Sequence, residues 1–149
     1  MMNEKRLQEA SNHLWYEIMM LHRLAPDVDS GVATAVWRYN ALVESFAIHT
    51  RNLIDFLHRR RSQQRVIAAH YFSPQKSWLA LCPDESTCLK TAENRAHQEI
   101  AHLTYARQNV KDKKWPAVEI VQELRPTIDL FIRETPKHLF GNRWTKSPF

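Results

Sequence analysis

Residues 94–107 read NRAHQEIAHLTYAR, and this short stretch holds two arginines, two histidines and a glutamate. Arg95, Glu99 and His102 are spaced by four and then three residues, so a helix would place them on one face. Arg95 and His102 would then lie about 10 Å apart along the helix axis. An arginine can hold a phosphate group at that separation while the histidine transfers a proton. The pattern predicts a nuclease-like site.

A second polar stripe lies earlier in the chain. At about 100° per residue, its side chains share one sector of a helix, opposite an apolar sector. Arg51 and His58 repeat the spacing of Arg95 and His102. The stripe consists of Glu44, Arg51, Asp55 and His58, at spacings of seven, four and three residues. The opposite sector holds Phe46, Leu53 and Leu57.

Two interpretations of these stripes need no catalysis. Arg51 with Asp55, and Arg95 with Glu99, have the spacing of ion pairs on solvent-facing helices, each contributing roughly 0.2–0.5 kcal/mol. Alternatively, the two pairs meet across a helix interface and fix how the helices pair. The protein would then be an interaction module that binds a protein or RNA without cutting it. The ion-pair interpretation explains the arginines but explains His102 less well, whereas the interaction module needs no coincidence of catalytic residues.

A metal site is a further interpretation. A carboxylate and a histidine three residues apart can bind one metal in carboxylate-bridged helical bundles, together with glutamates from the other helices. The residues with this pattern are Asp55, His58, Glu99 and His102, with Glu17 and Glu123 from the remaining helices. Arginines on the same faces oppose the binding of another cation. We therefore expect no metal and no cofactor.

The composition favours one small domain. The 149 residues include two glycines, too few for a glycine-rich phosphate loop or a dinucleotide-binding turn. Cys82 and Cys88 form no CxxC pair, and the charged start MMNEKRLQEA lacks the apolar core of a signal peptide. No window is apolar enough to cross a bilayer. We expect a single domain, residues 1–149, located in the cytoplasm with no membrane partner.

The positive charge is concentrated in two clusters. The formal net charge is +5, and the first cluster runs from His58 to Arg61 and includes Arg65. The second runs from Lys111 to Lys114. Such clusters favour nucleic acid through the release of counterions, although solvated loops give the same pattern.

Apolar residues recur three and four positions apart along most of the chain, which predicts an all-α fold. We expect a first helix over about residues 3–24, ended by Pro26, and a second from a cap at Asp29 or Ser30 to about residue 60. His49 lies on the apolar side of this second helix. We expect it to bond a backbone carbonyl in the core.

A third helix should run from a cap at Asp84 or Ser86 to about residue 107 or 110. A fourth should open at Trp115-Pro116 and kink at Pro126. The segment over residues 61–83 is expected to be irregular, with one short helical turn. These elements predict a four-helix up-down bundle with its core in residues 3–135. The tail, residues 136–149, should be flexible unless one of its aromatic residues docks.

The segment RAHQEIAH, from Arg95 to His102, resembles the HEPN superfamily. These are small α-helical bundles that include toxin and phage-defence ribonucleases, with a signature of an arginine, four to six residues and a histidine. Residues 45–57, SFAIHTRNLIDFL, are similar to segments of bacterial HEPN-like proteins related to an abortive-infection group. Many catalytic members have a polar residue after the arginine. Ala96 stands there, and an Arg-Asn dipeptide stands instead at Arg51-Asn52.

This resemblance implies a metal-independent endoribonuclease of a phage-defence or toxin–antitoxin type. The ribose 2′-OH would attack the adjacent phosphate, with His102 as general acid or base and Arg95 stabilising the phosphoryl oxygens. The resemblance also implies a homodimer, RNA as a partner and an antitoxin partner. Supporting or RNA-binding roles would fall to Arg51, Asn52, Asp55, His58, Glu99 and Tyr105.

Overall fold

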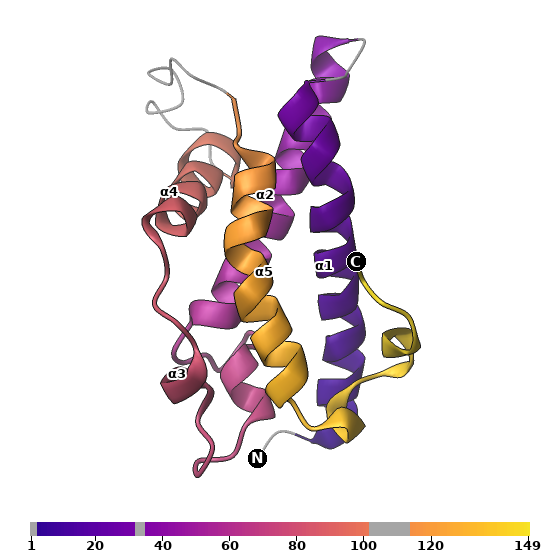
Figure 1. Ribbon diagram of the computed structural model, residues 1–149, viewed down its shortest axis with the longest axis vertical. Coiled ribbons are helices and arrows are strands. Elements are labelled where there is room, and N and C mark those ends of the chain that lie inside the picture. Colours follow the sequence, from indigo (N-terminus) through magenta and orange to yellow (C-terminus); the bar gives the residue numbers. More distant parts are fainter. Residues whose placement is uncertain (1–2, 32–34, 102–113) are drawn as a thin grey trace.

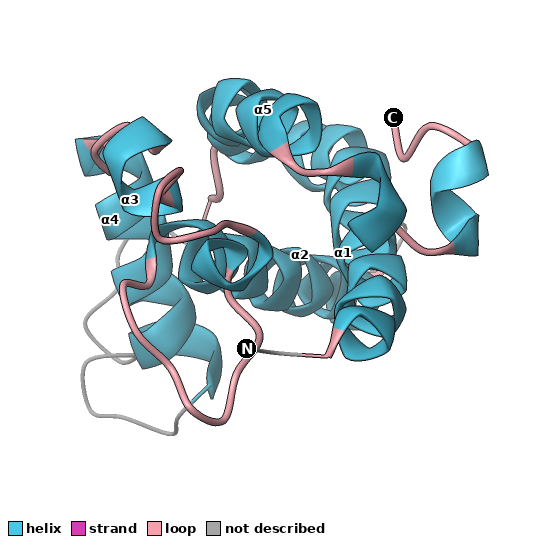
Figure 2. Ribbon diagram, turned by 90° about the horizontal axis from the view of Figure 1, so that it is seen from below, coloured by secondary structure: helices cyan, strands magenta, loops and turns pink. Residues whose placement is uncertain are grey.

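The computed structural model describes residues 3–31, 35–101 and 114–149. All regular structure in these ranges is helical, which confirms the predicted all-α fold (Figure 2). Three long helices lie side by side along the long axis of the molecule (Figure 1). They are α1 (Glu4–Ser30), α2 (Val36–His58) and α5 (Ala117–Glu134). The shorter helix α4 (Thr87–Arg95) packs against α2 and α5.

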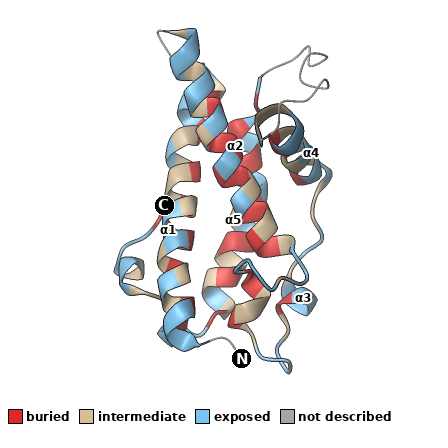
Figure 3. Cartoon of the chain, turned by 180° about the vertical axis from the view of Figure 1, so that it is seen from behind, coloured by how far each residue is buried: buried red, intermediate tan, exposed pale blue. Residues whose placement is uncertain are grey.

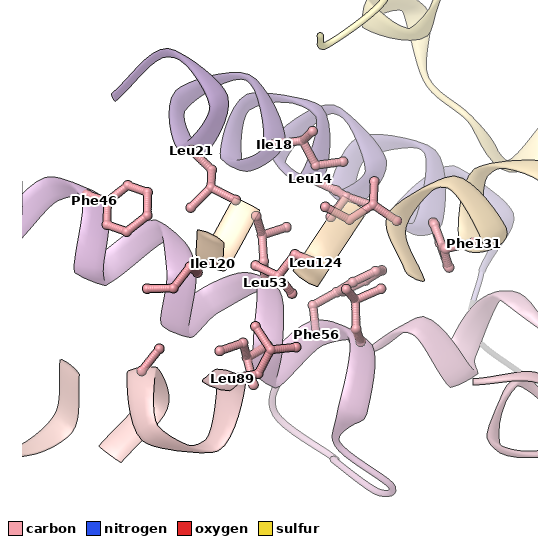
Figure 4. Packing of buried hydrophobic residues seen from close by; sticks show 14 of the residues in the cluster. Leu14, Ile18, Leu21, Phe46, Leu53, Phe56, Leu89, Ile120, Leu124 and Phe131 are labelled. Atoms are coloured by element: carbon pink, nitrogen blue, oxygen red, sulfur yellow. The ribbon is translucent and has the colours of Figure 1, made fainter. Parts of the chain in front are cut away.

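The core fills the space between these helices. Each helix carries apolar residues three and four positions apart, so each buries one face, and the outward sides are exposed (Figure 3). Side chains from four helices meet in one cluster (Figure 4). These include Leu14 and Ile18 of α1, Phe46 and Leu53 of α2, Leu89 of α4, and Leu124 and Phe131 of α5.

The first helix is longer than predicted. It continues through Pro26 to Ser30, so the expectation that the proline ends it is wrong. Ala25 and Val28 on either side of the proline are buried, and this packing offsets the loss of one helical hydrogen bond. The helix ends at Gly31, whose φ of 67° is the left-handed conformation that glycine adopts readily.

The second helix accordingly begins later. The predicted caps Asp29 and Ser30 are still inside α1, and Ala35 precedes the first helical residue, Val36, without a side-chain cap. An irregular segment follows α2, as predicted. It contains a short 3₁₀ turn (Ala68–Tyr71) and the single-turn helix α3 (Trp78–Leu81).

The irregular segment is anchored to the bundle by two aromatic side chains. The Tyr71 hydroxyl donates to the Leu7 carbonyl at 2.9 Å, and the Trp78 indole N–H donates to the Leu57 carbonyl at 2.7 Å. Both aromatic side chains are buried. These bonds satisfy the polar atoms of two large core residues.

The third predicted helix is observed as α4 and its continuation. Ser86 is the N-cap, and its hydroxyl accepts from the Leu89 backbone N–H at 3.3 Å. After Arg95 the chain continues as a π-helical turn (Ala96–Ala101). The predicted end of this helix falls in residues 102–113, outside the described residues. α5 begins just after Trp115-Pro116 and continues through Pro126.

The C-terminal tail packs along α1 on the outside of the bundle (Figure 1). Trp144 docks as the sequence allowed: its indole N–H donates to the Ser11 carbonyl at 2.8 Å. The Gly141 backbone N–H donates to the Ser11 hydroxyl at 2.7 Å, and that of Arg143 to the Asn12 side-chain oxygen at 3.0 Å. Among the helices described, none is both long enough and apolar enough to span a membrane.

Candidate functional site

Arg95 is the last residue of α4, and its guanidinium group is held on two sides. Its Nε lies 2.8 Å from Glu99 Oε1 and its Nη2 lies 3.2 Å from Glu99 Oε2. Its Nη1 donates to the Lys114 carbonyl at 2.9 Å. The guanidinium carbon also lies 4.7 Å from the ring centre of the buried Trp115. The predicted pair of Arg95 with Glu99 is therefore confirmed, in a bidentate form.

This arrangement ties α4 to the start of α5. The Arg95 and Glu99 side chains are 21% and 13% exposed, so the pair is largely shielded from water. Glu99 lies in the π-helical turn, a rare conformation that is frequent at functional sites. Arg95 and Trp115 also line a pocket of about 310 Å³ between α4 and α5, together with Cys88 and Glu119.

The partners predicted for Arg95 cannot be placed beside it. His102 and Tyr105 lie outside the described residues, as do residues 111–113 of the second basic cluster. The described part of this candidate site consists of Arg95, Glu99 and Trp115.

The second stripe does not form the ion pair that its spacing predicted. Asp55 pairs with Arg59, the C-cap residue that follows α2, and with Arg65, whose Nη1 lies 3.1 Å from Asp55 Oδ2. The expected pair of Arg51 with Asp55 is wrong. A carboxylate followed four residues later by a cation is the favourable order on a helix, and Arg59 satisfies it whereas Arg51 has the reverse order.

The two arginines keep Asp55 ionised. Burial on its own would raise the pKa of Asp55, but the hydrogen bonds and positive charges of Arg59 and Arg65 outweigh it and hold the pKa below its usual range. The predicted network, in which Arg51 and Asp55 would meet Arg95 and Glu99, is wrong for Asp55, since the carboxylate is occupied by these two arginines.

Arg51, Asn52 and Asp55 are brought together in a pocket of about 440 Å³ between α1 and α2, which we call the α1–α2 pocket. Arg51 makes no hydrogen bond or ion pair with any described residue. The pocket is completed by Arg65 and by two residues of α1. These are His13, for which the sequence pattern indicated no role, and Glu17, which it indicated only as a possible metal ligand. Leu14, Leu53 and Phe56 are among the apolar lining.

Glu17 is held in this pocket by two residues of α2. Its Oε2 lies 2.6 Å from His49 Nδ1 and accepts from the Asn52 amide at 3.2 Å. The expectation that His49 bonds a backbone carbonyl is therefore wrong, because its Nδ1 bonds the Glu17 carboxylate of α1 instead. The sequence indicated Glu17 only as a possible metal ligand. Its spacing of four from His13 puts both on one helical face, and this is the signal that could have indicated their shared pocket.

His58 belongs to a different pocket from Arg51. Its Nδ1 lies 3.6 Å from the Cys82 sulfur, and its Nε2 is buried with no hydrogen-bond partner in the described residues. Burial lowers the pKa of His58 and raises that of the Cys82 thiol to about 11. The stripe predicted on α2 is thus divided between two sites.

Of the two carboxylate–histidine pairs in the metal interpretation, the structure separates Asp55 from His58, and His102 of the other pair lies outside the described residues. Asp55 and His58 line separate pockets, and Glu17 is bonded to His49 and Asn52. Within the described ranges there is no group of three histidine, cysteine, aspartate or glutamate side chains that could hold a metal ion.

A scan of the sequence against protein-family models found no match, and searches of curated proteins and of solved structures found none either. The resemblance to the HEPN superfamily therefore rests on the segment from Arg95 to His102 and on residues 45–57.

Proposed function

We propose that the protein binds RNA through an arginine surface at the C-terminal end of α2. This surface consists of Arg51, Arg59, Arg60, Arg61 and Arg65. The observation that carries the proposal is the charge of residues 51–65. They contain five arginines and one acidic residue, a formal charge of +4, against +5 for the whole chain.

The arrangement of the arginines suits a phosphate backbone. Arg60 and Arg61 are exposed, and Asp55 holds Arg59 and Arg65 beside the α1–α2 pocket. Guanidinium groups bind phosphate oxygens in a bidentate manner, and each phosphate neutralised releases counterions. The segment from Arg95 to His102 resembles a ribonuclease signature, and this resemblance favours RNA as the polyanion.

The proposal predicts that RNA binding depends on salt and is weakened by substitutions in the arginine surface but not by substitutions of other exposed arginines. Fluorescence anisotropy with a labelled single-stranded RNA should give a logarithmic affinity that falls with logarithmic salt concentration, with a slope of about −0.7 per phosphate bound. The double substitution Arg60→Gln/Arg61→Gln removes two contacts. It should reduce the steepness of this slope by about 1.4 and weaken binding at low salt.

The matched control is Arg23→Gln/Arg38→Gln, which removes two exposed arginines from other parts of α1 and α2. Circular dichroism should show that both double variants keep the helical content of the wild type. If both lose affinity to the same extent, net charge rather than the arginine surface determines binding, and the proposal is wrong.

A second candidate function is metal-independent RNA cleavage by Arg95 and His102, in a defence or toxin–antitoxin setting. The observation that favours cleavage is the bidentate pair with Glu99, which holds Arg95 over Trp115 next to the π-helical turn. A catalytic cation must be held in one orientation. Cleavage of total RNA or tRNA in excess EDTA should then disappear in Arg95→Lys and His102→Ala.

The same resemblance leads us to propose a homodimer and an antitoxin partner. Sedimentation equilibrium of the purified protein tests the first, because a homodimer has twice the chain mass of 17.6 kDa. A protein that sediments as a monomer at all concentrations would contradict it.

A further inference from the structure

We infer that the α1–α2 pocket is a site of RNA cleavage by transesterification, with Glu17 as general base, His13 as general acid and Arg51 as the group that binds the phosphate. This inference rests on the proposed RNA binding. It adds chemistry at a site that uses neither Arg95 nor His102.

The first support is that acid, base and cation line one pocket. His13 and Glu17 are four residues apart on α1, so their side chains are neighbours on one helical face. Arg51 and Asn52 line the same pocket from α2, which packs along α1. Two packed helices therefore bring all four side chains to one pocket.

Glu17 has the environment of a positioned base. His49 and Asn52 both bond its Oε2, while no described residue bonds Oε1. The side chain is 24% exposed, so the carboxylate is shielded but reachable. One oxygen thus fixes the orientation of the carboxylate, and the other is available to accept a proton.

Arg51 has the environment of a phosphate-binding group. It is half-buried, it lines the pocket, and the aspartate four residues away is occupied by Arg59 and Arg65. A guanidinium that pairs with no carboxylate of the described residues can offer two parallel N–H groups to a phosphate. Arg65 belongs both to this pocket and to the arginine surface, so RNA bound along the surface reaches the pocket.

The reaction needs no metal and no co-reactant. Glu17 accepts the proton of the ribose 2′-OH while the 2′ oxygen attacks the adjacent phosphorus. The new P–O2′ bond forms as the P–O5′ bond breaks, and protonated His13 donates its proton to the departing O5′. The products are a 2′,3′-cyclic phosphate and a 5′-OH end. Arg51 stabilises the charge on the phosphoryl oxygens in the transition state.

The test measures cleavage in excess EDTA of a single-stranded RNA and of a diribonucleoside monophosphate, which is too short to extend from the pocket to the rest of the arginine surface. Glu17→Gln and His13→Ala should each lower the cleavage rate by about 10²- to 10⁴-fold, and Arg51→Gln by about 10²- to 10³-fold. Controls are Glu9→Gln and His138→Ala, which remove an exposed glutamate and an exposed histidine outside the pocket.

Two modified substrates separate catalysis from folding. An RNA with a 2′-deoxyribose at the cleaved position should not be cut, because it lacks the nucleophile. A substrate with sulfur in place of O5′ has a leaving group that needs little protonation. It should be cut by His13→Ala almost as fast as by wild type, while Glu17→Gln stays slow.

The outcomes are distinct. RNA binding with no cleavage of either substrate overturns this inference and leaves the proposed binding intact. Cleavage that is lost in His102→Ala and kept in Glu17→Gln and His13→Ala also overturns it and assigns the chemistry to the second candidate function. Cleavage of the short substrate without binding of longer RNA supports the inference and contradicts the arginine surface.

Discussion

Arg51 and Arg95 are the same residue type on neighbouring helices, yet their surroundings differ. Arg95 has a carboxylate four residues later, a backbone carbonyl and a buried indole around its guanidinium group. Asp55, the carboxylate four residues after Arg51, is bonded to Arg59 and Arg65 instead, and Arg51 lies in an open pocket with no hydrogen-bond partner among the described residues. Because a guanidinium group is charged at every physiological pH, its partners decide whether it stabilises the fold or binds an external anion.

Removing Arg95 should therefore destabilise the protein. Arg95→Ala leaves the Glu99 carboxylate, 13% exposed, without its bidentate partner and removes a cation from Trp115. We expect the free energy of unfolding, measured by urea denaturation, to fall by about 2 kcal/mol. Arg133→Ala is the control, since that side chain is 66% exposed, and it should cost less than about 1 kcal/mol. Equal losses would show that Arg95 is not a structural link.

Cys82 should react slowly with thiol reagents. Burial is the main cause that raises its pKa to about 11, with the negative charge of Asp84 adding to it, so the thiol stays protonated at neutral pH. In a Cys88→Ser variant, the reaction with a disulfide reagent should be about 100-fold slower than for the same protein in denaturant. A native rate equal to the denatured rate would contradict this environment.

At the scale of elements, hydrophobic spacing was enough to predict the helices but not the boundary between the first and the second. Pro26 was expected to end the first helix because proline is unfavourable inside a helix. The burial of Val28 stabilises the helix beyond it, and the helix continues to Ser30. Glycine after a run of helical residues was the better signal. The functional pairings were harder to predict, since Glu17 and His49 are 32 residues apart and meet only when α1 packs on α2.

The docking of the tail on α1 depends on a glycine for reasons of space. A Cβ at Gly141 would lie 2.4 Å from the Asn12 side-chain oxygen, although its φ of −79° suits any residue. Gly141→Ala should therefore weaken the tail contact and speed cleavage by trypsin after Arg143 or Lys146. The double variant Asn12→Ala/Gly141→Ala removes the clash and should slow this cleavage again.

Gly31→Ala is the control for the tail. Nothing lies within 4 Å of a Cβ there, but its φ of 67° is strained for alanine, so about 1 kcal/mol of stability should be lost. Trypsin cleavage of the tail should not change. Release of the tail in both variants would indicate global destabilisation instead of a local clash.

The whole molecule is held together by a core between helices, and two half-buried histidines, His22 and His58, lie at its edges. His22 Nδ1 of α1 donates to the Ile18 carbonyl at 2.9 Å and its ring packs against Phe149, while His58 of α2 contacts Cys82. Burial is the largest cause that lowers the pKa of each histidine. The neutral ring is thus favoured by folding at two distant places.

A lowered histidine pKa makes the stability depend on pH. Between the lowered folded pKa and the ordinary value of 6.5, the unfolded chain binds more protons than the folded chain. Stability therefore falls as the pH drops through this window. We expect the melting temperature to decrease from about pH 7.5 to about pH 5.5, on either side of the ordinary histidine pKa.

The carboxylates act in other pH ranges. The pKa of Asp55 is lowered, so its stabilising effect is lost only below the usual carboxylate range. Burial raises the pKa of Glu85 above its ordinary value of 4.5. Its contribution to stability therefore has the opposite sign to that of Asp55 and is lost as the pH rises.

Because the pKa of His58 is lowered, His58→Gln should show a smaller decrease in melting temperature between about pH 7.5 and about pH 5.5 than wild type. His138→Gln, which changes an exposed histidine, should follow the wild type, and an equal decrease in all three proteins would assign the effect to groups other than His58.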